Sequence, residues 1–236
     1  MTTLTVPARF NGPPESANGG WSAGRLAGRC ETSAAEPAVT VRLCAPPPLE
    51  VALRVERDGG AVRLLDGETL VATASAAPSP GEPVSGPVTY AEAVAAGSAY
   101  EGLAEHPFPT CYSCGTDRSD GLGLCPGRID GGDGAYAAAW SPTEVTTENV
   151  WAALDCPGGW SAGIAGRPMV LGTMTAQVDA LPEIGEECVV MAWPCGGSGR
   201  RFESGSALYG TTGRLLARAH AVWIAVDPAA VRPHGR

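Results

Sequence analysis

The stretch Asn18-Gly19-Gly20-Trp21-Ser22-Ala23-Gly24-Arg25-Leu26-Ala27-Gly28-Arg29 occurs a second time in this chain, as Pro157-Gly158-Gly159-Trp160-Ser161-Ala162-Gly163-Ile164-Ala165-Gly166-Arg167. Both copies contain the hexapeptide Gly-Gly-Trp-Ser-Ala-Gly, and the residues after it also match. Tryptophan is rare, with six in 236 residues, so chance is a poor explanation for the match. We interpret the two stretches as the trace of an internal duplication.

Strand-like segments surround both copies in the same order. The first copy is expected to form a helix between a strand at 4–10 and strands at 39–43, 49–56, 61–65 and 69–74. The second is expected to belong to a helix region that begins near 149, between a strand at 135–140 and strands at 170–178, 188–193, 200–209 and 214–226. Hairpin-forming Asp-Gly pairs at 58–60 and 66–67, and Thr-Thr-Gly at 211–213, separate neighbouring strands. The sequence of each half therefore predicts a strand, then a helix that contains the glycine pair, and then an antiparallel meander.

The glycines inside these helices need a physical reason. Glycine costs about 1 kcal/mol relative to alanine in a helix, so several together imply that the backbone closely approaches a sheet or a ligand. We expect each glycine pair to stand at the start of its helix.

A proline-rich segment separates the two halves. It contains Pro78, Pro80, Pro83 and Pro87, and an alanine-rich run from 90 to 103 could form a short helix. We therefore predict a first unit at 1–77, a linker at 78–110 and a second unit at 111–236.

Composition limits the classes of function. The chain is 44% hydrophobic, enough for a core, and its formal net charge of −9 argues against a large phosphate-binding surface. The N-terminus shows no basic segment followed by an apolar run, and no window is long and apolar enough for a membrane span. We expect a soluble cytoplasmic protein that binds neither nucleic acid nor membrane.

The eight cysteines are expected to be reduced thiols, as is usual in the cytoplasm. Only Cys111 and Cys114 have the spacing of metal ligands, and a tetrahedral zinc site needs further partners. Cys125 and His106 are close in sequence, but their spacing fits no zinc pattern. No metal ligand is therefore assigned from the sequence, which leaves open whether Cys111 and Cys114 bind a metal.

A family resemblance rests on the segment from Cys111 to Leu124, which reads CYSCGTDRSDGLGL. It is similar to the CxxCG…GLGL lead-in that precedes the hotdog domain of many thioesterases of the phenylacetate-pathway type. Asn18-Gly19-Gly20 and Pro157-Gly158-Gly159 resemble the His-Gly-Gly or Asn-Gly-Gly turn of those proteins. The whole chain then looks like a double hotdog, as in several acyl-CoA thioesterases and hydratases.

The resemblance implies an α+β fold with two tandem hotdog domains, each an antiparallel sheet wrapped around a central helix. It implies hydrolysis of an acyl-CoA or acyl-carrier thioester, with coenzyme A as part of the substrate and no other cofactor. It also implies a homo-oligomer, a dimer of double hotdogs.

Chemistry explains why glycines belong in such a site. A thioester carbonyl can accept a hydrogen bond from a backbone N–H at a helix start, where unpaired donors and the helix dipole favour developing negative charge. Gly19 and Gly20 are the candidate donors, and Asn18 is a candidate orienting amide. Alternatively, the glycines only let each helix turn tightly under its sheet.

Hydrolysis also needs a carboxylate. The family usually places it on the helix after the glycines, but residues 22–29 contain no acid. Asp155 is the best substitute, as an acid or base in a single site between the two halves; alternatively, it caps a helix N-terminus. Further candidates for contact with the substrate are Gly158, Gly159, Trp21 and Trp160, with Arg200 and Arg201 for the phosphates of coenzyme A or, alternatively, as a solvated strand end.

Two other functions remain open on this fold. A hydratase or dehydratase usually needs a histidine paired with an acid, and the sequence shows no such pair near either glycine turn. A non-catalytic acyl-CoA binding protein would explain the missing helix acid. Fold alone does not decide among the three.

Overall fold

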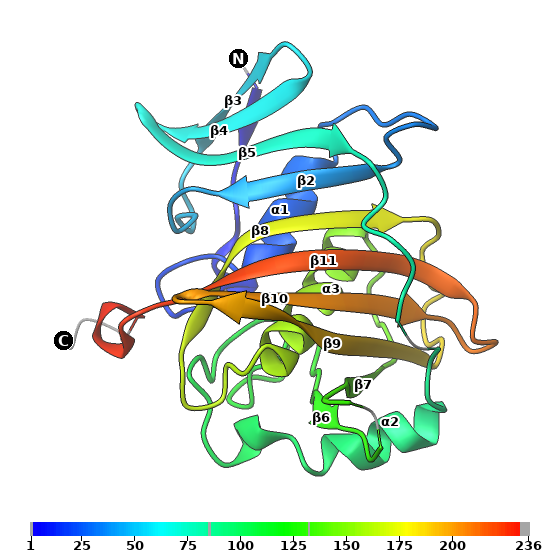
Figure 1. Cartoon of the computed structure of the whole chain (residues 1–236). Helices are drawn as coiled ribbons and strands as arrows, with labels where there is room; N and C mark the ends of the chain where they lie inside the picture. The colour runs from blue at the N-terminus through cyan, green and yellow to red at the C-terminus, as the bar shows by residue number, and fades with distance from the viewer. Residues whose placement is uncertain (1, 85, 132, 232–236) are drawn as a thin grey trace.

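In the computed structural model, which describes residues 2–84, 86–131 and 133–231, the strands form one antiparallel sheet of eleven strands (Figure 1). Their order across the sheet is β1-β3-β4-β5-β2-β8-β11-β10-β9-β7-β6. The strands are β1 (Thr2–Leu4), β2 (Ala38–Leu43), β3 (Leu53–Asp58), β4 (Ala61–Asp66), β5 (Thr69–Ala77), β6 (Gly127–Arg128), β7 (Tyr136–Trp140), β8 (Met169–Val178), β9 (Cys188–Ser198), β10 (Arg201–Tyr209) and β11 (Leu215–Ala225).

The strand order has the same pattern on both sides of the sheet's centre. β2 pairs with β8 there, and the hydroxyls of Thr40 and Thr175 lie 2.7 Å apart across the seam. Outward from β2 come β5, β4, β3 and β1, and outward from β8 come β11, β10, β9 and β7. We call β1–β5 with helix α1 the N-terminal half, and β6–β11 with helix α3 the C-terminal half.

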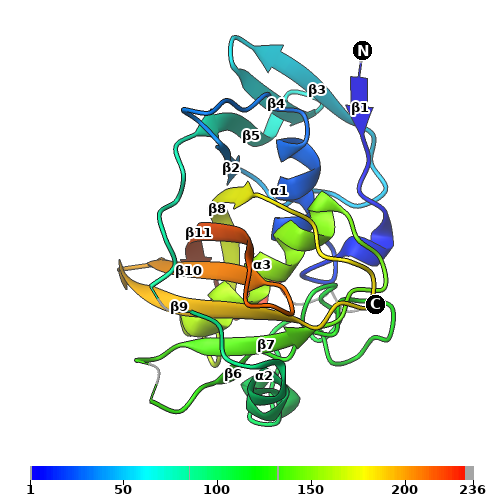
Figure 2. The ribbon, with the colours of Figure 1, turned by 90° about the vertical axis from the view of Figure 1, so that its right-hand side faces the viewer.

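Two helices lie side by side on one face of the sheet, α1 (Gly19–Ala27) and α3 (Thr147–Ser161) (Figure 2). Asn18 caps α1 by accepting the N–H of Trp21 at 2.8 Å, and Thr146 caps α3 by accepting the N–H of Asn149 at 3.1 Å. Such caps satisfy backbone donors that have no partner within the helix. The caps therefore decide where each helix begins.

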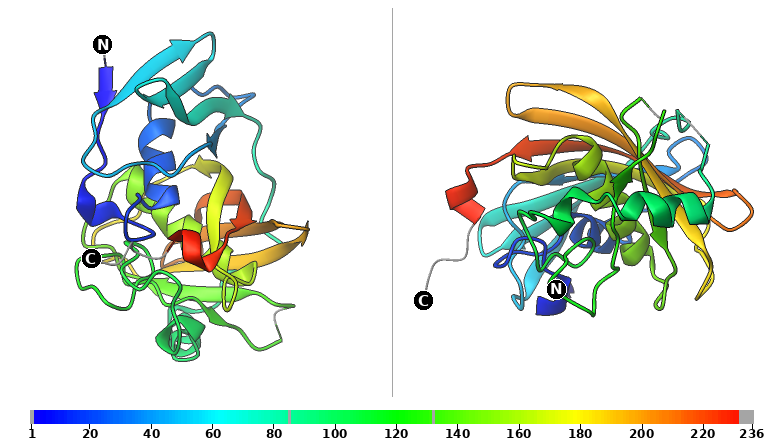
Figure 3. Two further views of the ribbon diagram at one scale, coloured as in Figure 1. Left: turned by 90° about the vertical axis from the view of Figure 1, so that its left-hand side faces the viewer. Right: turned by 90° about the horizontal axis from the view of Figure 1, so that it is seen from below.

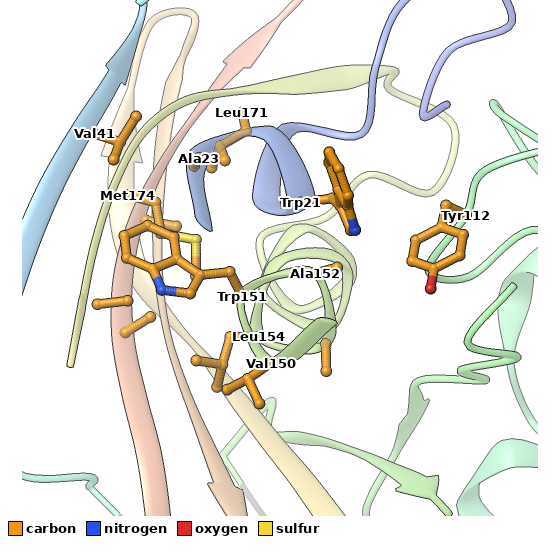
Figure 4. Close-up of a cluster of buried hydrophobic side chains, with 14 of the residues drawn as sticks. Trp21, Ala23, Val41, Tyr112, Val150, Trp151, Ala152, Leu154, Leu171 and Met174 are labelled. Carbon is orange, nitrogen blue, oxygen red and sulfur yellow. The ribbon is translucent and has the colours of Figure 1, made fainter. Parts of the chain in front are cut away.

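One large hydrophobic core contains residues of both halves. Figure 4 shows Trp151 of α3 directed at the sheet beside Met174, and Trp21 of α1 directed away from it towards Tyr112. Trp151 is 2% exposed, and full burial of a large apolar side chain stabilises the fold by about 2–3 kcal/mol. Trp21 stacks on Phe10 with ring centroids 4.0 Å apart. The halves are thus packed together rather than merely linked.

The segment that connects the two halves, 78–110, contains a helix of its own. α2 (Tyr90–Gly97) begins with a capping box between Thr89 and Glu92 and lies along β6 and β7 at the sheet edge (Figure 3). Its buried Ala93 packs in a small second cluster with residues of β7 and β9. Three short 3₁₀ helices complete the described chain, η1 (Ala8–Phe10), η2 (Glu101–Leu103) and η3 (Pro228–Val231).

Most predicted strands are confirmed; those predicted at 69–74 and 188–193 run on to Ala77 and Ser198, and two others differ more strongly. The strand expected at 4–10 stops at Leu4 and gives way to η1, because Pro7 has no N–H to donate to a neighbouring strand. The strand expected at 49–56 begins at Leu53; just before it, Glu50 has φ +60°, which is incompatible with a strand.

The second glycine stretch is not a helix start, and this prediction is wrong. Gly158 and Gly159 lie near the end of α3, which has run from Thr147, and Pro157 lies inside the same helix. Within the described residues no helix is both long and apolar enough to cross a membrane.

Candidate functional site

A cavity of about 500 Å³ opens where β2 and β11 end and β8 begins, beside the N-terminus of α1. Its walls are largely apolar and include Leu43, Ile164, Met169, Leu171, Trp223 and Ile224. Its polar lining comes from Glu15, Ser16, Asn18, Gly19, His106 and Asp155, together with four cysteines, Cys44, Cys111, Cys114 and Cys156. An apolar pocket of this size with a few convergent polar groups is typical of a small-molecule site.

The first turn of α1 presents backbone donors at the cavity. The N–H of Gly20 donates to Oδ2 of Asp155 at 2.9 Å. Within the described residues the N–H of Gly19 has no hydrogen-bond partner, and Gly19 lines the cavity. Because the N-terminal end of a helix carries partial positive charge, this turn favours a negatively charged or strongly polar oxygen.

Asp155 lies in the interior of α3 and points at the N-terminus of α1. The residue is 3% exposed, and its Oδ1 has no hydrogen-bond partner among the described residues. Burial raises the pKa of this carboxyl to about 7, an effect that the N–H of Gly20 partly opposes. The alternative that Asp155 caps its own helix is wrong; it accepts a donor from the first turn of the neighbouring helix instead.

Close packing of the two helices brings these groups together. A Cβ on Gly20 would lie 2.5 Å from Cβ of Asp155 and 2.7 Å from the backbone oxygen of Trp151. A Cβ on Gly24 would lie 2.8 Å from Cβ of Trp151. The close approach predicted for this glycine stretch is therefore to α3 at Gly20 and Gly24, whereas at Gly19 it is to the sheet, where an added Cβ would lie 2.8 Å from Cβ of Leu171.

Three thiols gather beside these groups. The Sγ atoms of Cys111, Cys114 and Cys156 all lie within 4.8 Å of one another, and those of Cys111 and Cys156 are 3.6 Å apart. Hydrogen bonds from the thiols of Cys114 and Cys156 hold the pKa of Cys111 well below its usual value. Cys111 and Cys114 are buried, and Cys156 is partly exposed.

The third member of this cluster, Cys156, has no sequence spacing that points to it. Cys125 is closer in sequence to the first two cysteines, but its thiol donates to the backbone oxygen of Gly123 at 3.8 Å. Cys156 belongs to α3, and only the fold brings it to Cys111 and Cys114. All eight cysteines are free thiols in the structure.

His106 also lines the cavity, although its sequence context is only a proline-rich loop. Its Nδ1 accepts the backbone N–H of Phe108 at 2.9 Å, so in the neutral ring the proton is on Nε2. Nε2 lies 3.0 Å from the backbone oxygen of Cys114 and 3.4 Å from its Sγ. Burial lowers the pKa of this imidazole.

The remaining predicted residues are divided between the cavity and other places. Trp160 lines the cavity, whereas Trp21 packs on Phe10 outside it. Gly158 and Gly159 face the sheet, where added Cβ atoms would lie 2.7 Å from Oγ of Ser204 and 3.0 Å from the ring of Trp223. These two glycines therefore serve helix–sheet contact.

The arginine pair lies at the turn between β9 and β10. Arg200 and Arg201 are exposed and do not line the cavity. Nε of Arg200 donates to the backbone oxygen of Ala225 at 3.0 Å, and the flanking Ile224 and Val226 do line it. The pair thus lies close to the cavity without forming its wall.

Comparisons with known proteins agree on the fold. No protein-family model matches the sequence, and no curated protein matches it significantly. A hotdog-fold protein of unknown function from Alicyclobacillus acidocaldarius superposes with a TM-score of 0.59 at 15% identity, covering 96% of this chain and 93% of that one. A tesB protein from Mycobacterium avium subspecies paratuberculosis gives 0.56 at 11% identity, covering 95% and 91%.

An acyl-CoA thioesterase II from Mycobacterium marinum is similar over a shorter span, with a TM-score of 0.52 at 10% identity and coverage of 82% and 81%. At such low identity these likenesses bear on architecture alone. The chain has a hotdog fold.

Proposed function

We propose that this chain hydrolyses an acyl-CoA or acyl-carrier thioester in the cavity beside the N-terminus of α1. One observation carries the proposal: Asp155 and Gly19 line the same largely apolar cavity, and among the described residues neither Oδ1 of Asp155 nor the N–H of Gly19 has a hydrogen-bond partner. Two proteins of similar fold are named as a tesB protein and an acyl-CoA thioesterase II, which supports this class of reaction.

The acyl group would occupy the apolar part of the cavity, with its carbonyl oxygen at the N–H of Gly19. Negative charge develops on that oxygen when the carbonyl carbon is attacked. A fixed backbone donor at the positive end of a helix stabilises that charge, and one such donor contributes a factor of about 10²–10³ in rate. The N–H of Gly20 is already used to hold Asp155.

Asp155 would act as the acid and base of the reaction. Its carboxylate takes a proton from a water molecule while the water oxygen bonds to the carbonyl carbon. The carbon–sulfur bond then breaks, and the thiolate leaving group takes that proton from Asp155. Asn18 helps indirectly, because its cap on Trp21 fixes the first turn of α1.

Several features of the larger assembly also belong to this proposal. The matching strand orders on both sides of the β2–β8 seam support two tandem hotdog units that share one site. In this proposal, Arg200 and Arg201 would contact the phosphates of coenzyme A, which is supported by the contact of Arg200 with Ala225 near the cavity. A dimer and a cytoplasmic location remain predictions from the sequence.

The hydratase alternative receives no support from His106. It is the histidine that lines the cavity with Asp155, but one ring nitrogen accepts from Phe108 and the other faces the backbone of Cys114. Its ring nitrogens are thus engaged in the loop.

The test is a panel of acyl-CoA substrates assayed by release of free thiol, with wild type and Asp155→Asn. Asparagine keeps an oxygen that can accept from Gly20, so the fold should survive, whereas loss of proton transfer should reduce kcat by about 10²–10⁴. Asp58→Asn, at an exposed residue at the end of β3, is the matched control and should retain wild-type activity.

Two results would contradict the proposal. Equal rates for wild type and Asp155→Asn would remove Asp155 from the reaction. If no substrate in the panel is hydrolysed while acyl-CoA still binds, the chain is instead a non-catalytic acyl-CoA binding protein.

A further inference from the structure

We propose that Cys111, Cys114 and Cys156 bind a zinc ion through their three thiolates. Their Sγ atoms lie within 4.8 Å of one another, and the closest pair is 3.6 Å apart. Two sulfurs on a tetrahedral zinc ion, with Zn–S bonds of about 2.3 Å, lie about 3.8 Å apart. The inference depends on this geometry and not on the proposed hydrolysis.

The local backbone is shaped to present the first two thiols. The N–H of Gly115 donates to the backbone oxygen of Cys111 at 2.8 Å, which closes the turn that contains both cysteines. A Cβ on Gly115 would lie 2.5 Å from the backbone oxygen of Pro109 and 2.6 Å from the nitrogen of Cys111. Glycine is therefore required for this turn to form as it does.

The third thiol comes from a different element. Cys156 belongs to α3 and follows Asp155 directly, so a metal ion at the cluster would tie the 111–115 turn to the helix that carries the proposed acid–base residue. Ser113, inside the turn, donates from its hydroxyl to the backbone oxygen of Ala152 at 2.9 Å. The turn is thus already fixed against α3 beside the cluster.

Polar donors around the sulfurs support bound thiolates over neutral thiols. Nδ2 of Asn18 lies 3.6 Å from Sγ of Cys111 and 4.0 Å from Sγ of Cys156, and Nε2 of His106 lies 3.4 Å from Sγ of Cys114. A neutral thiol is a weak acceptor, so it has little use for such donors. Hydrogen bonds to ligand atoms are, by contrast, a regular feature around bound metals.

His106 belongs to the surroundings of this site and is not a fourth ligand. The N–H of Phe108 occupies its Nδ1, so Nε2 holds the ring proton and donates towards Cys114. All three cysteines line the cavity, which leaves the fourth position of a tetrahedral ion to water or to a ligand from the cavity. Three protein ligands and one open position are the arrangement of catalytic zinc sites.

The donor set selects the metal. Thiolates are soft ligands that favour zinc, copper(I) or iron–sulfur clusters over magnesium or calcium. Zinc takes tetrahedral thiolate sites of this size without redox chemistry. We therefore assign the site to zinc.

The experiment measures metal directly in the full chain, purified under reducing conditions. Elemental analysis should find one zinc ion per chain. After chelation, titration with Co²⁺ should produce one equivalent of sulfur-to-cobalt charge-transfer absorbance, which zinc then abolishes. Cys156→Ser should weaken Co²⁺ binding by roughly 100-fold or more, because losing a ligand should exceed the 10–100-fold effect of removing an outer contact.

The matched control is Cys125→Ser, which removes a cysteine close to the motif but outside the cluster and should bind Co²⁺ as wild type does. The proposal is overturned if the wild-type chain binds neither zinc nor Co²⁺, a result that requires no variant to fold. It is also overturned if a folded Cys156→Ser binds Co²⁺ with unchanged affinity, or if Cys111 and Cys156 prove to be joined by a disulfide. The zinc content and the Co²⁺ affinity are measured without a thioester substrate, so they test the metal site separately from the proposed hydrolysis.

Discussion

The hexapeptide Gly-Gly-Trp-Ser-Ala-Gly opens helix α1 but lies across the end of helix α3. In α1, Gly20 and Gly24 face α3 and Gly19 faces Leu171 of the sheet. The N–H of Gly20 donates to Asp155, and Gly19 lines the cavity. In α3 the corresponding glycines lie inside the helix, where backbone N–H groups are used by the helix itself. They face Ser204 and Trp223 of the sheet instead.

The difference shows that the preceding residues, and not the hexapeptide, decide its role. Asn18 caps α1 directly before the first glycine pair, so these residues form the first turn. Thr146 caps α3 well before the second pair, so the helix is almost complete when it reaches Gly158. One copy therefore supplies N–H groups that its own helix does not use, and the other helix supplies Asp155, which accepts the N–H of Gly20.

Substitution of Gly20 by alanine should have the largest effect on stability. The added Cβ would overlap backbone of Trp151 and Ala152, which cannot move like a side-chain end, and overpacking of this kind costs about 1–3 kcal/mol. Urea unfolding should show a loss near the upper end of that range, and thioester hydrolysis should fall because Asp155 is displaced.

Gly28→Ala is the control for that prediction, since the nearest atom to its added Cβ is 3.7 Å away. Its free energy of unfolding should stay within about 0.5 kcal/mol of wild type. Similar losses in the two variants would mean that α1 and α3 are not packed at Gly20 as described.

The equivalent substitution in the second copy, Gly159→Ala, should have a smaller effect. Its Cβ would lie 3.0 Å from the ring of Trp223, a side chain that can shift by a few tenths of an ångström. Alanine also gains about 1 kcal/mol of helix propensity there. The free energy of unfolding, measured in urea, should fall by less than about 1 kcal/mol, and activity should be retained. A larger fall than in Gly20→Ala would mean that the second glycine pair, and not the first, makes the tighter contact.

The smallest effect is expected at the ion pair that joins the other ends of the helices. Arg25 contacts Glu148 at 3.0 Å, with the arginine side chain 46% exposed. Glu148→Gln should lower the free energy of unfolding by at most about 1 kcal/mol at low salt, and the difference should shrink in high salt. A loss of hydrolysis in this variant would indicate that the cavity is sensitive to the whole helix contact rather than to Gly20 and Asp155.

Much of the fold could be predicted from local signals. Hairpin turns at Gly59 and Gly67, which have φ of +60° and +56°, required glycine and were visible as Asp-Gly pairs. The alternation of apolar and polar residues located most strands. The sequence also predicted that the first glycine pair and Asp155, which belong to different halves, share one site. The N–H of Gly20 does donate to Asp155, at 2.9 Å.

What the sequence could not show depends on contacts between distant segments. Matching hexapeptides suggested matching helix positions, but a helix start is set by capping at Thr146, which the repeat does not include. Cys156 has no spacing that ties it to Cys111 and Cys114, so only the packing of α3 against the 111–115 turn reveals the cluster. His106 and Asp155 likewise meet in one cavity only through the fold.

The central claim is that the N–H of Gly19 binds the reacting carbonyl, and a pair of variants at this residue tests it most directly. Gly19 is the first residue of α1, a position where proline fits a helix. Gly19→Pro removes the N–H, whereas Gly19→Ala keeps it; both variants add a Cβ beside Leu171, at 2.8 Å.

The measurement is kcat of the two variants on the best acyl-CoA substrate. Loss of an oxyanion donor should make Gly19→Pro about 10²–10³ times slower than Gly19→Ala. Equal rates in two folded variants would contradict the claim and leave the first glycine pair with a packing role alone.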